Sequence, residues 1–271
     1  MVLAVSCSWL VNPTAYSLEG PPGLSTEAEL ALEVAEAPCA DRKRLDSVRD
    51  LFQKMGAAAE DIAVHKQRRV SNLSVTLPGA SPESEKIVIG AHYDKVIPGC
   101  GAVDNWSGIV ILAHLYRALK EIPRAKTLVF VAFGREEQGL RGSKAMVQQL
   151  SEAEVANHCA MINLDSFGMS WPQVATNLST DSLGELAADL AEQMNMQFSQ
   201  QPVDGGSDST SFLRRGIPAM TLHALGKDFD KIIHTHRDRA NQVQPTSLYL
   251  GYRLALTLVL AVDQKPCGAW R

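Results

Sequence analysis

The sequence predicts an α/β fold: a single-domain, three-layer sandwich with helices on both faces of a twisted, mixed and largely parallel sheet. Two observations support this prediction. Apolar runs of strand length alternate along the chain with stretches that have the period of an amphipathic helix. The 271 residues, 45% of them hydrophobic, also suffice for one large core. Residues 1–25 are rich in Pro, Gly and Ser, so we expect a loosely structured arm before one folded domain at 26–271.

The first half of the domain begins with two helical stretches between Thr26 and Gly56, the second with Lys54 in its last turn. SNLSVTLPG alternates like a half-buried strand, and EKIVIGAHYD has the apolar content of a fully buried one. A helix is expected from about Ser107, as N-cap, to Glu121. The next predicted elements are a strand at 126–134, a helix at 142–150 and a strand at 159–166.

The second half continues the alternation of strands and helices. A strand is expected near 173–178, followed by a helix at 182–194 that Ser182 or Asp181 would cap. SDSTSFLRRG has the pattern of a short helix closed by Gly216. IPAMTLHAL then predicts a strand, and a C-terminal helix is expected from Pro245.

Charge and hydropathy narrow the possible partners and compartments. The net charge is −4 and no long basic run occurs, which argues against nucleic acid and anionic membranes as partners. LYLGYRLALTLVLAV contains Arg253 and is shorter than the ~20 apolar residues of a membrane span, so a buried helix is expected. MVLAVSCSWLV lacks the positive flank of a signal peptide. The sequence thus favours the cytoplasm, with export through an atypical or trimmed signal left open.

The five cysteines form an odd, scattered set without a CxxC pair, which argues against a disulfide framework or a zinc ribbon. Cys100 is expected to be a small loop residue, and Cys159 falls inside an apolar strand and is expected in the core. The full set is Cys7, Cys39, Cys100, Cys159 and Cys267.

Metal-binding side chains follow several of the apolar runs. The carboxyl ends of strands in an α/β sheet are where such folds place ligands, so we expect these side chains to meet at one edge. Imidazole and carboxylate ligands suit Zn²⁺, and two ions can share one bridging carboxylate. The sequence therefore predicts a metallohydrolase with the candidate ligands His92, Asp104, Glu137, Asp165 and His234.

The individual motifs differ in how specific they are. In HYD, strand periodicity would place Asp94 on the same side as His92, where it could bond the far imidazole nitrogen. Asp104 lies in GAVDNWSG just before a helix, and Asp165 stands at the close of the apolar run in MINLDSFG. A helix cap or a turn is the alternative role for either aspartate.

AFGREEQGLRGS is the most specific segment, because two adjacent carboxylates directly follow a buried strand. If Glu137 binds metal, Glu136 is left to take a proton from the attacking water and to pass it to the leaving amine. In IIHTHRD we choose His234 as the ligand and Asp238 as its hydrogen-bond partner, with His236 at the pocket rim. The spacing leaves an exchange of the two histidines open.

Together HYD, GAVDNWSG, REEQGLRGS, NLDSFG, GSDSTSFLRRGIPA and HTHRD resemble the zinc-dependent aminopeptidases typified by secreted bacterial leucine aminopeptidases, over roughly residues 70–262. Their superfamily includes glutamate carboxypeptidases, glutaminyl cyclases and the transferrin receptor. The resemblance implies that 26–271 is a catalytic domain with two zinc ions, one held by His92 and Asp165 and one by Glu137 and His234. Asp104 would bridge them.

The resemblance also implies roles for residues that do not bind the ions. Glu136 would be the general base, and Ser207 would lie near the scissile group, with a helix cap as its equally plausible alternative. The Asp104–Asn105 peptide bond would be cis.

Three other functions are alternatives to an aminopeptidase acting on peptides with a free N-terminus. Glutaminyl cyclases share the scaffold, and FLRRGIP resembles theirs, but DNWSG and EEQGLRGS are aminopeptidase-like and no Trp precedes His234. Acetylornithine deacetylase-like enzymes insert a lid domain, for which the 234 − 165 = 69 positions before the last histidine are too few. Non-catalytic relatives have usually lost ligands. The preferred N-terminal residue and the oligomeric state stay open.

Overall fold

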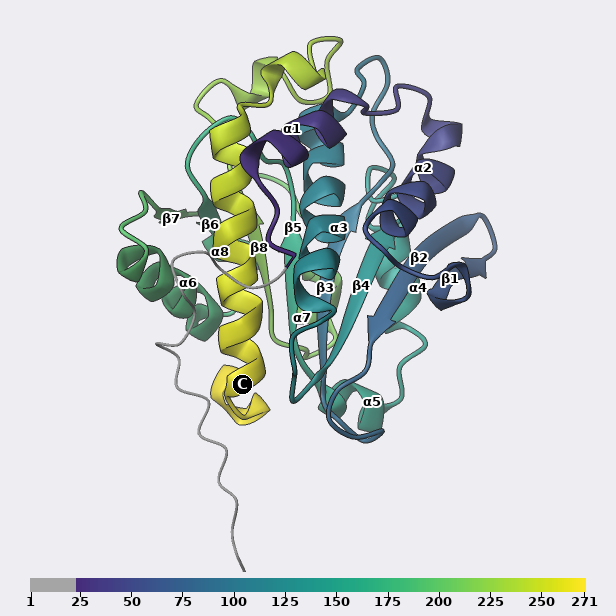
Figure 1. The fold of residues 1–271 in the computed structure, drawn as a ribbon, viewed down its shortest axis with the longest axis vertical. Coiled ribbons are helices and arrows are strands. Elements are labelled where there is room, and N and C mark those ends of the chain that lie inside the picture. The colour runs from purple at the N-terminus through teal and green to yellow at the C-terminus, as the bar shows by residue number, and fades with distance from the viewer. Residues whose placement is uncertain (1–22) are drawn as a thin grey trace, which may run out of the picture.

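The structure, a computed structural model, describes residues 23–271 and is built around one eight-stranded mixed sheet (Figure 1). The strand order is β1-β2-β4-β3-β5-β8-β6-β7, and four of the seven neighbouring pairs are parallel. The strands are β1 Ile62–Gln67, β2 Val70–Leu77, β3 Lys86–His92, β4 Thr127–Phe133, β5 His158–Leu164, β6 Gln173–Ala175, β7 Ser199–Gln201 and β8 Ala219–His223.

Helices cover both faces of this sheet, as the sequence predicts. Helices α1, α2, α3 and α8 pack together on one face, and α4 and α7 pack on the other, each over its own apolar cluster (Figure 1). The helices are α1 Glu27–Ala35, α2 Asp41–Lys54, α3 Ser107–Leu119, α4 Arg141–Val147, α5 Glu152–Asn157, α6 Asp181–Gln193, α7 Ser209–Arg214 and α8 Pro245–Gln264. The predicted three-layer α/β class is therefore confirmed.

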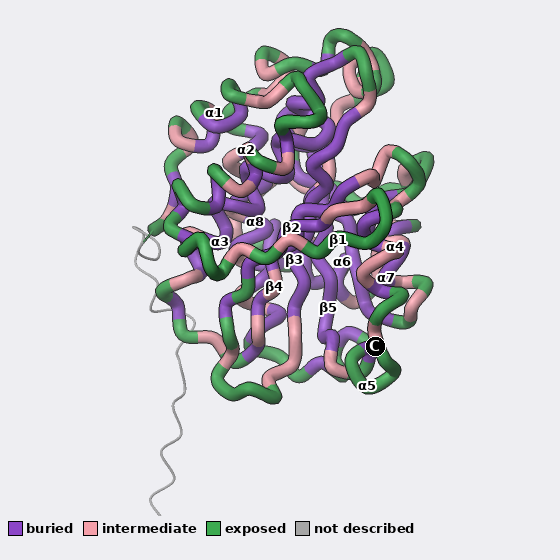
Figure 2. Tube along the Cα trace, turned by 90° about the vertical axis from the view of Figure 1, so that its right-hand side faces the viewer, coloured by how far each residue is buried: buried purple, intermediate pink, exposed green. Residues whose placement is uncertain are grey.

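The central strands are buried on both faces, which explains their continuous apolar sequences. Residues of β3 alternate between the two clusters, with Ile87 and Ile89 in the larger one and Val88 in the smaller. The tube in Figure 2 shows β3, β4 and β5 largely buried between the helices. Parallel strands buried in this way hold their carboxyl ends at one rigid edge.

Most of the predicted elements are present, and the differences have simple causes. The sequence reasoning missed β1, β7 and α5, because β1 and β7 are largely exposed and polar and α5 is short. Ser107 is the first residue of α3 rather than its N-cap, and its Oγ donates to the carbonyl of Val103 at 2.7 Å. The N-cap of α6 is Thr180, so the predicted capping roles of Ser182 and Asp181 are wrong.

The prediction that the cysteines form no disulfides is wrong. Cys39 is bonded to Cys100, and Cys159 to Cys267, across sequence separations of 61 and 108 residues. Such long separations leave no local spacing pattern, and the fold alone brings the partners together. Cys7 lies outside the described residues.

Most of the predicted N-terminal arm, residues 1–22, lies outside the described part of the chain. Ser25 is buried, with its backbone N–H 3.2 Å from the hydroxyl of Tyr252 and its Oγ 2.6 Å from Nδ1 of His114. Helix α8 is long and apolar enough for a membrane span by composition, but 56% of that window is buried in the fold. A core helix passes the same test, and α8 packs against α1, α3 and α6.

Candidate metal centre

The five predicted ligand side chains come together at the carboxyl edge of the parallel strands. His92 is the last residue of β3, Asp165 follows β5, and Glu137 lies in the turn after β4. Asp104 comes from the loop after β3, and His234 from the loop after β8. All five side chains line one cavity of about 510 Å³ together with Glu136. Because β3 pairs with both β4 and β5 in parallel, the three strand ends meet there.

The contacts divide the five side chains into two sets that share Asp104. Nε2 of His92 is 3.0 Å from Oδ1 of Asp104 and 3.5 Å from Oδ1 of Asp165. Nε2 of His234 is 3.0 Å from Oδ2 of Asp104 and 3.2 Å from Oε2 of Glu137. Each oxygen of the Asp104 carboxylate therefore faces a different imidazole.

These distances fit the donor set of two divalent ions. Two ligand atoms that each lie ~2.1 Å from a tetrahedral Zn²⁺ are about 3.3–3.4 Å from one another. The imidazole-to-carboxylate distances in the cluster, 3.0 to 3.5 Å, bracket that value. Oε1 of Glu137 is buried and has no hydrogen-bond partner among the described residues. An unpartnered buried carboxylate oxygen is costly, and a cation would satisfy it.

The loop that carries Asp104 is locked to the end of β5. The Asp104–Asn105 peptide bond is cis, as the resemblance implies. Nδ2 of Asn105 donates to the carbonyl of Leu164 at 2.8 Å, and its Oδ1 accepts from the backbone N–H groups of Gly108 at 3.0 Å and Ser166 at 3.1 Å. A Cβ at Gly108 would lie 2.4 Å from Oδ1 of Asn105, so glycine is required for this close approach.

Asp94 does not play the predicted role. Its carboxylate accepts the backbone N–H groups of Glu136 at 2.9 Å and Glu137 at 3.3 Å, and lies 3.8 Å from Nδ1 of His92. The closer neighbour of Nδ1 is the backbone carbonyl of Asp94, at 3.2 Å. Strand periodicity fails as a guide because β3 ends at His92. Asp94 therefore fixes the turn that holds the two glutamates.

Asp238 also differs from the prediction. Its carboxylate accepts the backbone N–H of Val103 at 2.7 Å and that of Asp104 at 3.2 Å, so it supports the Asp104 loop rather than His234. Of the two histidines that the spacing left open, His234 faces Asp104 and Glu137, and His236 is exposed and does not line the cavity.

Ser207 touches the cluster through Asp165. Its Oγ donates to Oδ2 of Asp165 and is 2.5 Å from Nδ2 of Asn163. Helix α7 begins two residues later, with Asp208 at its N-cap, so Ser207 is not the helix cap. Its proximity to a scissile group stays a prediction.

Burial and mutual repulsion shift the pKa values of the cluster. Burial, with help from Asp165, Asp208 and Asp104, raises the pKa of Glu136 to about 10. Hydrogen bonds to Asp104 and Glu137 raise the pKa of His234 to about 10. Burial would raise the pKa of Asp104, but its hydrogen bonds to the two imidazoles outweigh that effect and lower it. Since a bound metal requires deprotonated ligands, a cation would displace the proton of His234, and its positive charge would favour the ionised form of the neighbouring Glu136.

Sequence reasoning missed two residues of this region. Asp208 is fully buried, and burial raises the pKa of its carboxyl to about 7. His223, at the end of β8, lines both the site cavity and a neighbouring cavity of about 700 Å³. Burial lowers the pKa of His223 to about 4, and its Nε2 has no partner among the described residues. GSD gave a signal for Asp208, whereas a single histidine in an apolar strand gives none.

The chain is similar to known peptidases in sequence and in fold. The sequence model of peptidase family M28 matches residues 72–259. Aminopeptidase YwaD of Bacillus subtilis is 32% identical over 174 residues, which are 62% of this chain and 38% of YwaD. The solved structure of BSAP, a zinc aminopeptidase from Bacillus subtilis, is 26% identical with a TM-score of 0.65, covering 73% of this chain and 52% of that one.

A glutaminyl cyclase from an Acidobacteriales bacterium shares the fold, with 17% identity, a TM-score of 0.74 and coverage of 89% of this chain and 94% of that one. This chain spans about a third to a half of the two aminopeptidases just named. The family match covers well over half of the chain, and all five candidate ligands lie within it. The chain therefore belongs to peptidase family M28.

Proposed function

We propose that this chain is a zinc-dependent aminopeptidase that hydrolyses the N-terminal peptide bond of peptides and holds two zinc ions that share Asp104. The observation that carries the proposal is the Asp104 carboxylate, whose two oxygens face His92 and His234 at 3.0 Å each. The printed names of YwaD and BSAP, an aminopeptidase and a zinc aminopeptidase, support it.

In this proposal His92 and Asp165 hold one ion, and Glu137 and His234 hold the other. Bound zinc supplies Lewis acidity, which polarises a peptide carbonyl and makes water more acidic. The protein residues provide the rest of the chemistry. The ends of β3, β4 and β5 bring His92, Glu137 and Asp165 together. Hydrogen bonds to Asp94 hold the turn of Glu137, and a hydrogen bond from Asn105 holds the Asp104 loop.

Glu136 is the proposed proton carrier. It lies beside Glu137 in the same cavity, and no hydrogen bond from a neighbouring residue occupies its carboxylate among the described residues. Glu136 would take a proton from the attacking water and pass it to the departing amine. The free α-amine of the substrate would be anchored at the metal centre, which would restrict cleavage to the N-terminal residue.

The test combines zinc content with hydrolysis of aminoacyl-naphthylamides. Purified protein should contain close to two zinc ions per chain and should release naphthylamine. A chelator should abolish turnover, and zinc should restore it. Protein that contains zinc but releases no naphthylamine from any of the aminoacyl substrates would contradict the proposal.

A second candidate is a glutaminyl-peptide cyclotransferase. The observation that favours it is the match to a glutaminyl cyclase along 94% of that chain's length, whereas the match to BSAP covers only half of BSAP. This enzyme would convert N-terminal glutaminyl peptides and release ammonia without free amino acid. Measurement of both products from one glutaminyl peptide separates the two functions. A non-catalytic binding protein is disfavoured, because all five candidate ligands and Glu136 are present.

We also propose that the protein works in an oxidising compartment. Disulfides persist mainly in secreted and periplasmic proteins and are rare in the reducing cytoplasm. The two disulfides therefore favour export over the cytoplasm. Fractionation of the native host, with mass spectrometry of the unreduced protein, would test this assignment.

A further inference from the structure

Arg44 of α2 is completely buried beside the metal centre, although it lies outside the region that matches the family. Within residues 23–271, all of its hydrogen bonds go to backbone carbonyls. Its guanidinium donates to the carbonyl of Cys100 at 2.8 Å, to those of Gly101 and Pro38 at 3.1 Å, and to that of Tyr93. It also lies over the ring of Trp106, 5.1 Å from the centroid. A buried charge is costly unless its hydrogen bonds are satisfied, so this arrangement needs a reason.

The bonded carbonyls lie on both sides of one loop. Tyr93 directly follows His92, and Cys100 and Gly101 shortly precede Asp104. Arg44 therefore joins the start of the loop to its end and sets the path of the chain between two candidate ligands. A single planar guanidinium with five N–H groups can do this, and a lysine ammonium cannot.

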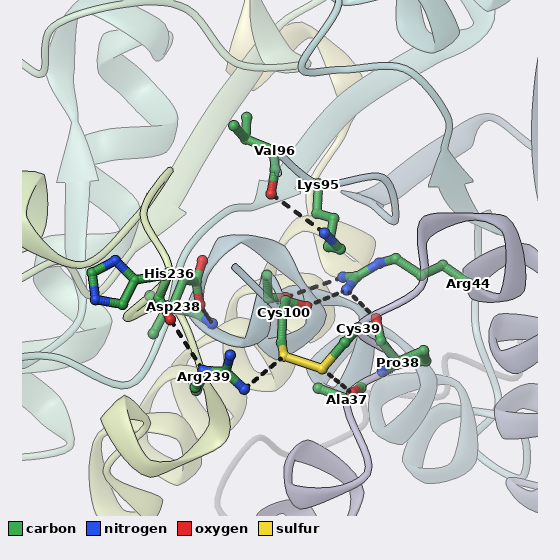
Figure 3. The surroundings of a disulfide bond; sticks show 12 residues. Ala37, Pro38, Cys39, Arg44, Lys95, Val96, Cys100, His236, Asp238 and Arg239 are labelled. Carbon is green, nitrogen blue, oxygen red and sulfur yellow. Dashed lines mark hydrogen bonds between the residues drawn. A yellow bond between two sulfur atoms is a disulfide. The ribbon is translucent and has the colours of Figure 1, made fainter. Parts of the chain in front are cut away.

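A disulfide reinforces the same connection. Cys39, in the segment between α1 and α2, is bonded to Cys100, four residues before Asp104 (Figure 3). The backbone N–H of Cys100 donates to the carbonyl of Asp238 at 2.7 Å. The carboxylate of Asp238 in turn holds the backbone N–H groups of Val103 and Asp104. The loop is thus fixed between the N-terminal segment on one side and the His234 loop on the other.

The second disulfide provides a contrast. Cys159 lies at the amino end of β5, and Asp165 follows the carboxyl end of the same strand. The Cys159–Cys267 bond therefore stabilises the fold at the opposite edge of the sheet from the cluster. It is a matched control for Cys39–Cys100. Arg117 of α3, which pairs with Glu29 at 2.9 Å, is the matched control for Arg44.

We propose that residues 36–44 are a working part of the metal centre, in which Arg44 and the Cys39–Cys100 disulfide position the Asp104 loop for zinc. Arg44 is a positioning residue: it acts on the ions only through the backbone that carries Asp104. The inference rests on the proposed zinc site, but its test uses zinc alone and needs no turnover. Its consequence is that the N-terminal helices contribute to metal affinity as well as to the core.

The test measures zinc affinity by competition with a chromophoric chelator, and melting temperature in excess chelator, for five variants. Arg44→Met, Arg44→Lys and the double variant C39S/C100S should each weaken zinc binding, by about 10–100-fold for Arg44→Met, as is typical when support of a metal ligand is lost. Arg44→Lys should be intermediate. Arg117→Met and C159S/C267S should lower the melting temperature and leave zinc affinity within about twofold of wild type.

Two outcomes would overturn the inference. One is unchanged zinc affinity in folded Arg44→Lys and C39S/C100S protein. The other is an equal loss of affinity in C159S/C267S, which would show a general effect of stability. If Arg44→Met does not fold, Arg44→Lys and the disulfide pair decide the question. Failure of wild-type protein to bind zinc would instead refute the proposed function, so the two failures are distinguishable.

Discussion

His92 and Asp165 stand at the ends of β3 and β5, whereas Asp104 and His234 come from loops. The first pair is held by the hydrogen bonds of the sheet, and its side chains are 2% and 15% exposed. His234 is 52% exposed, and its loop reaches the rest of the site through Asp238 and Cys100. The comparison shows two ways of fixing a ligand: by strand geometry, or by crosslinks between loops.

The largest expected effect comes from Asp104, which the two proposed zinc sites share. Asp104→Asn replaces a bridging carboxylate with a neutral amide, which is a much poorer zinc ligand. We expect both ions to be lost and zinc affinity to fall by at least about 100-fold, beyond the loss expected for a supporting residue. Zinc content after gel filtration is the measurement. Retention of two ions per chain would show that Asp104 does not bridge.

The two proposed zinc sites should respond differently when each loses its histidine. His92→Ala opens a cavity at a buried strand end, so it should remove one ion and also destabilise the zinc-free protein by about 1–3 kcal/mol. His234→Ala removes an exposed loop side chain without opening a buried cavity, so it should lose one ion with a smaller loss of stability, limited to its ion pairs with Asp104 and Glu137. Urea unfolding in excess chelator measures the difference. Equal destabilisation by both variants would remove the distinction between strand-held and loop-held ligands.

A smaller effect is expected from pH. It compares how His114, in helix α3, and the histidines of the site change the stability of the fold. Burial, with a contribution from Arg117, lowers the pKa of His114 to about 3. An unfolded histidine titrates near ~6.5, so the unfolded chain binds more protons than the folded one below that pH. Stability should therefore fall as the pH drops from about 6.5 toward 3, by up to ~2 kcal/mol at pH 5 from this residue.

The control for this pH effect is His114→Asn, which keeps a buried polar group without the titration. The melting temperature of the variant should fall less than that of wild type between pH 7 and pH 5. The site histidines act in the opposite direction without metal, because the neighbouring carboxylates raise the pKa of His234 and stabilise its charged form at low pH. An identical slope in both proteins would show that His114 does not contribute.

The strand-held part of the site could be predicted from sequence, and the loop supports could not. Apolar runs that end in His, Asp or Glu identify the ligands at strand ends because sheet geometry makes those ends converge. The support of Asp104 by Asp238 joins residues 134 positions apart, and the Arg44–Cys100 bond spans 56. Such contacts depend on tertiary packing alone, as do the two disulfides. The hydrogen bond predicted between the Asp94 carboxylate and His92 fails for a related reason, because strand periodicity stops at His92.

The central claim is that adjacent glutamates divide the chemistry, with Glu137 binding zinc and Glu136 moving the proton. The most direct test is the turnover of aminoacyl-naphthylamide per bound zinc in Glu136→Gln protein, with Glu137→Gln as the matched neighbour. Glu136→Gln should keep two zinc ions and the fold but lose about 10²–10⁴-fold in turnover, the usual contribution of a general acid–base group. Glu137→Gln should lose zinc as well. Near wild-type turnover by zinc-loaded Glu136→Gln would show that Glu136 is not the group that moves the proton.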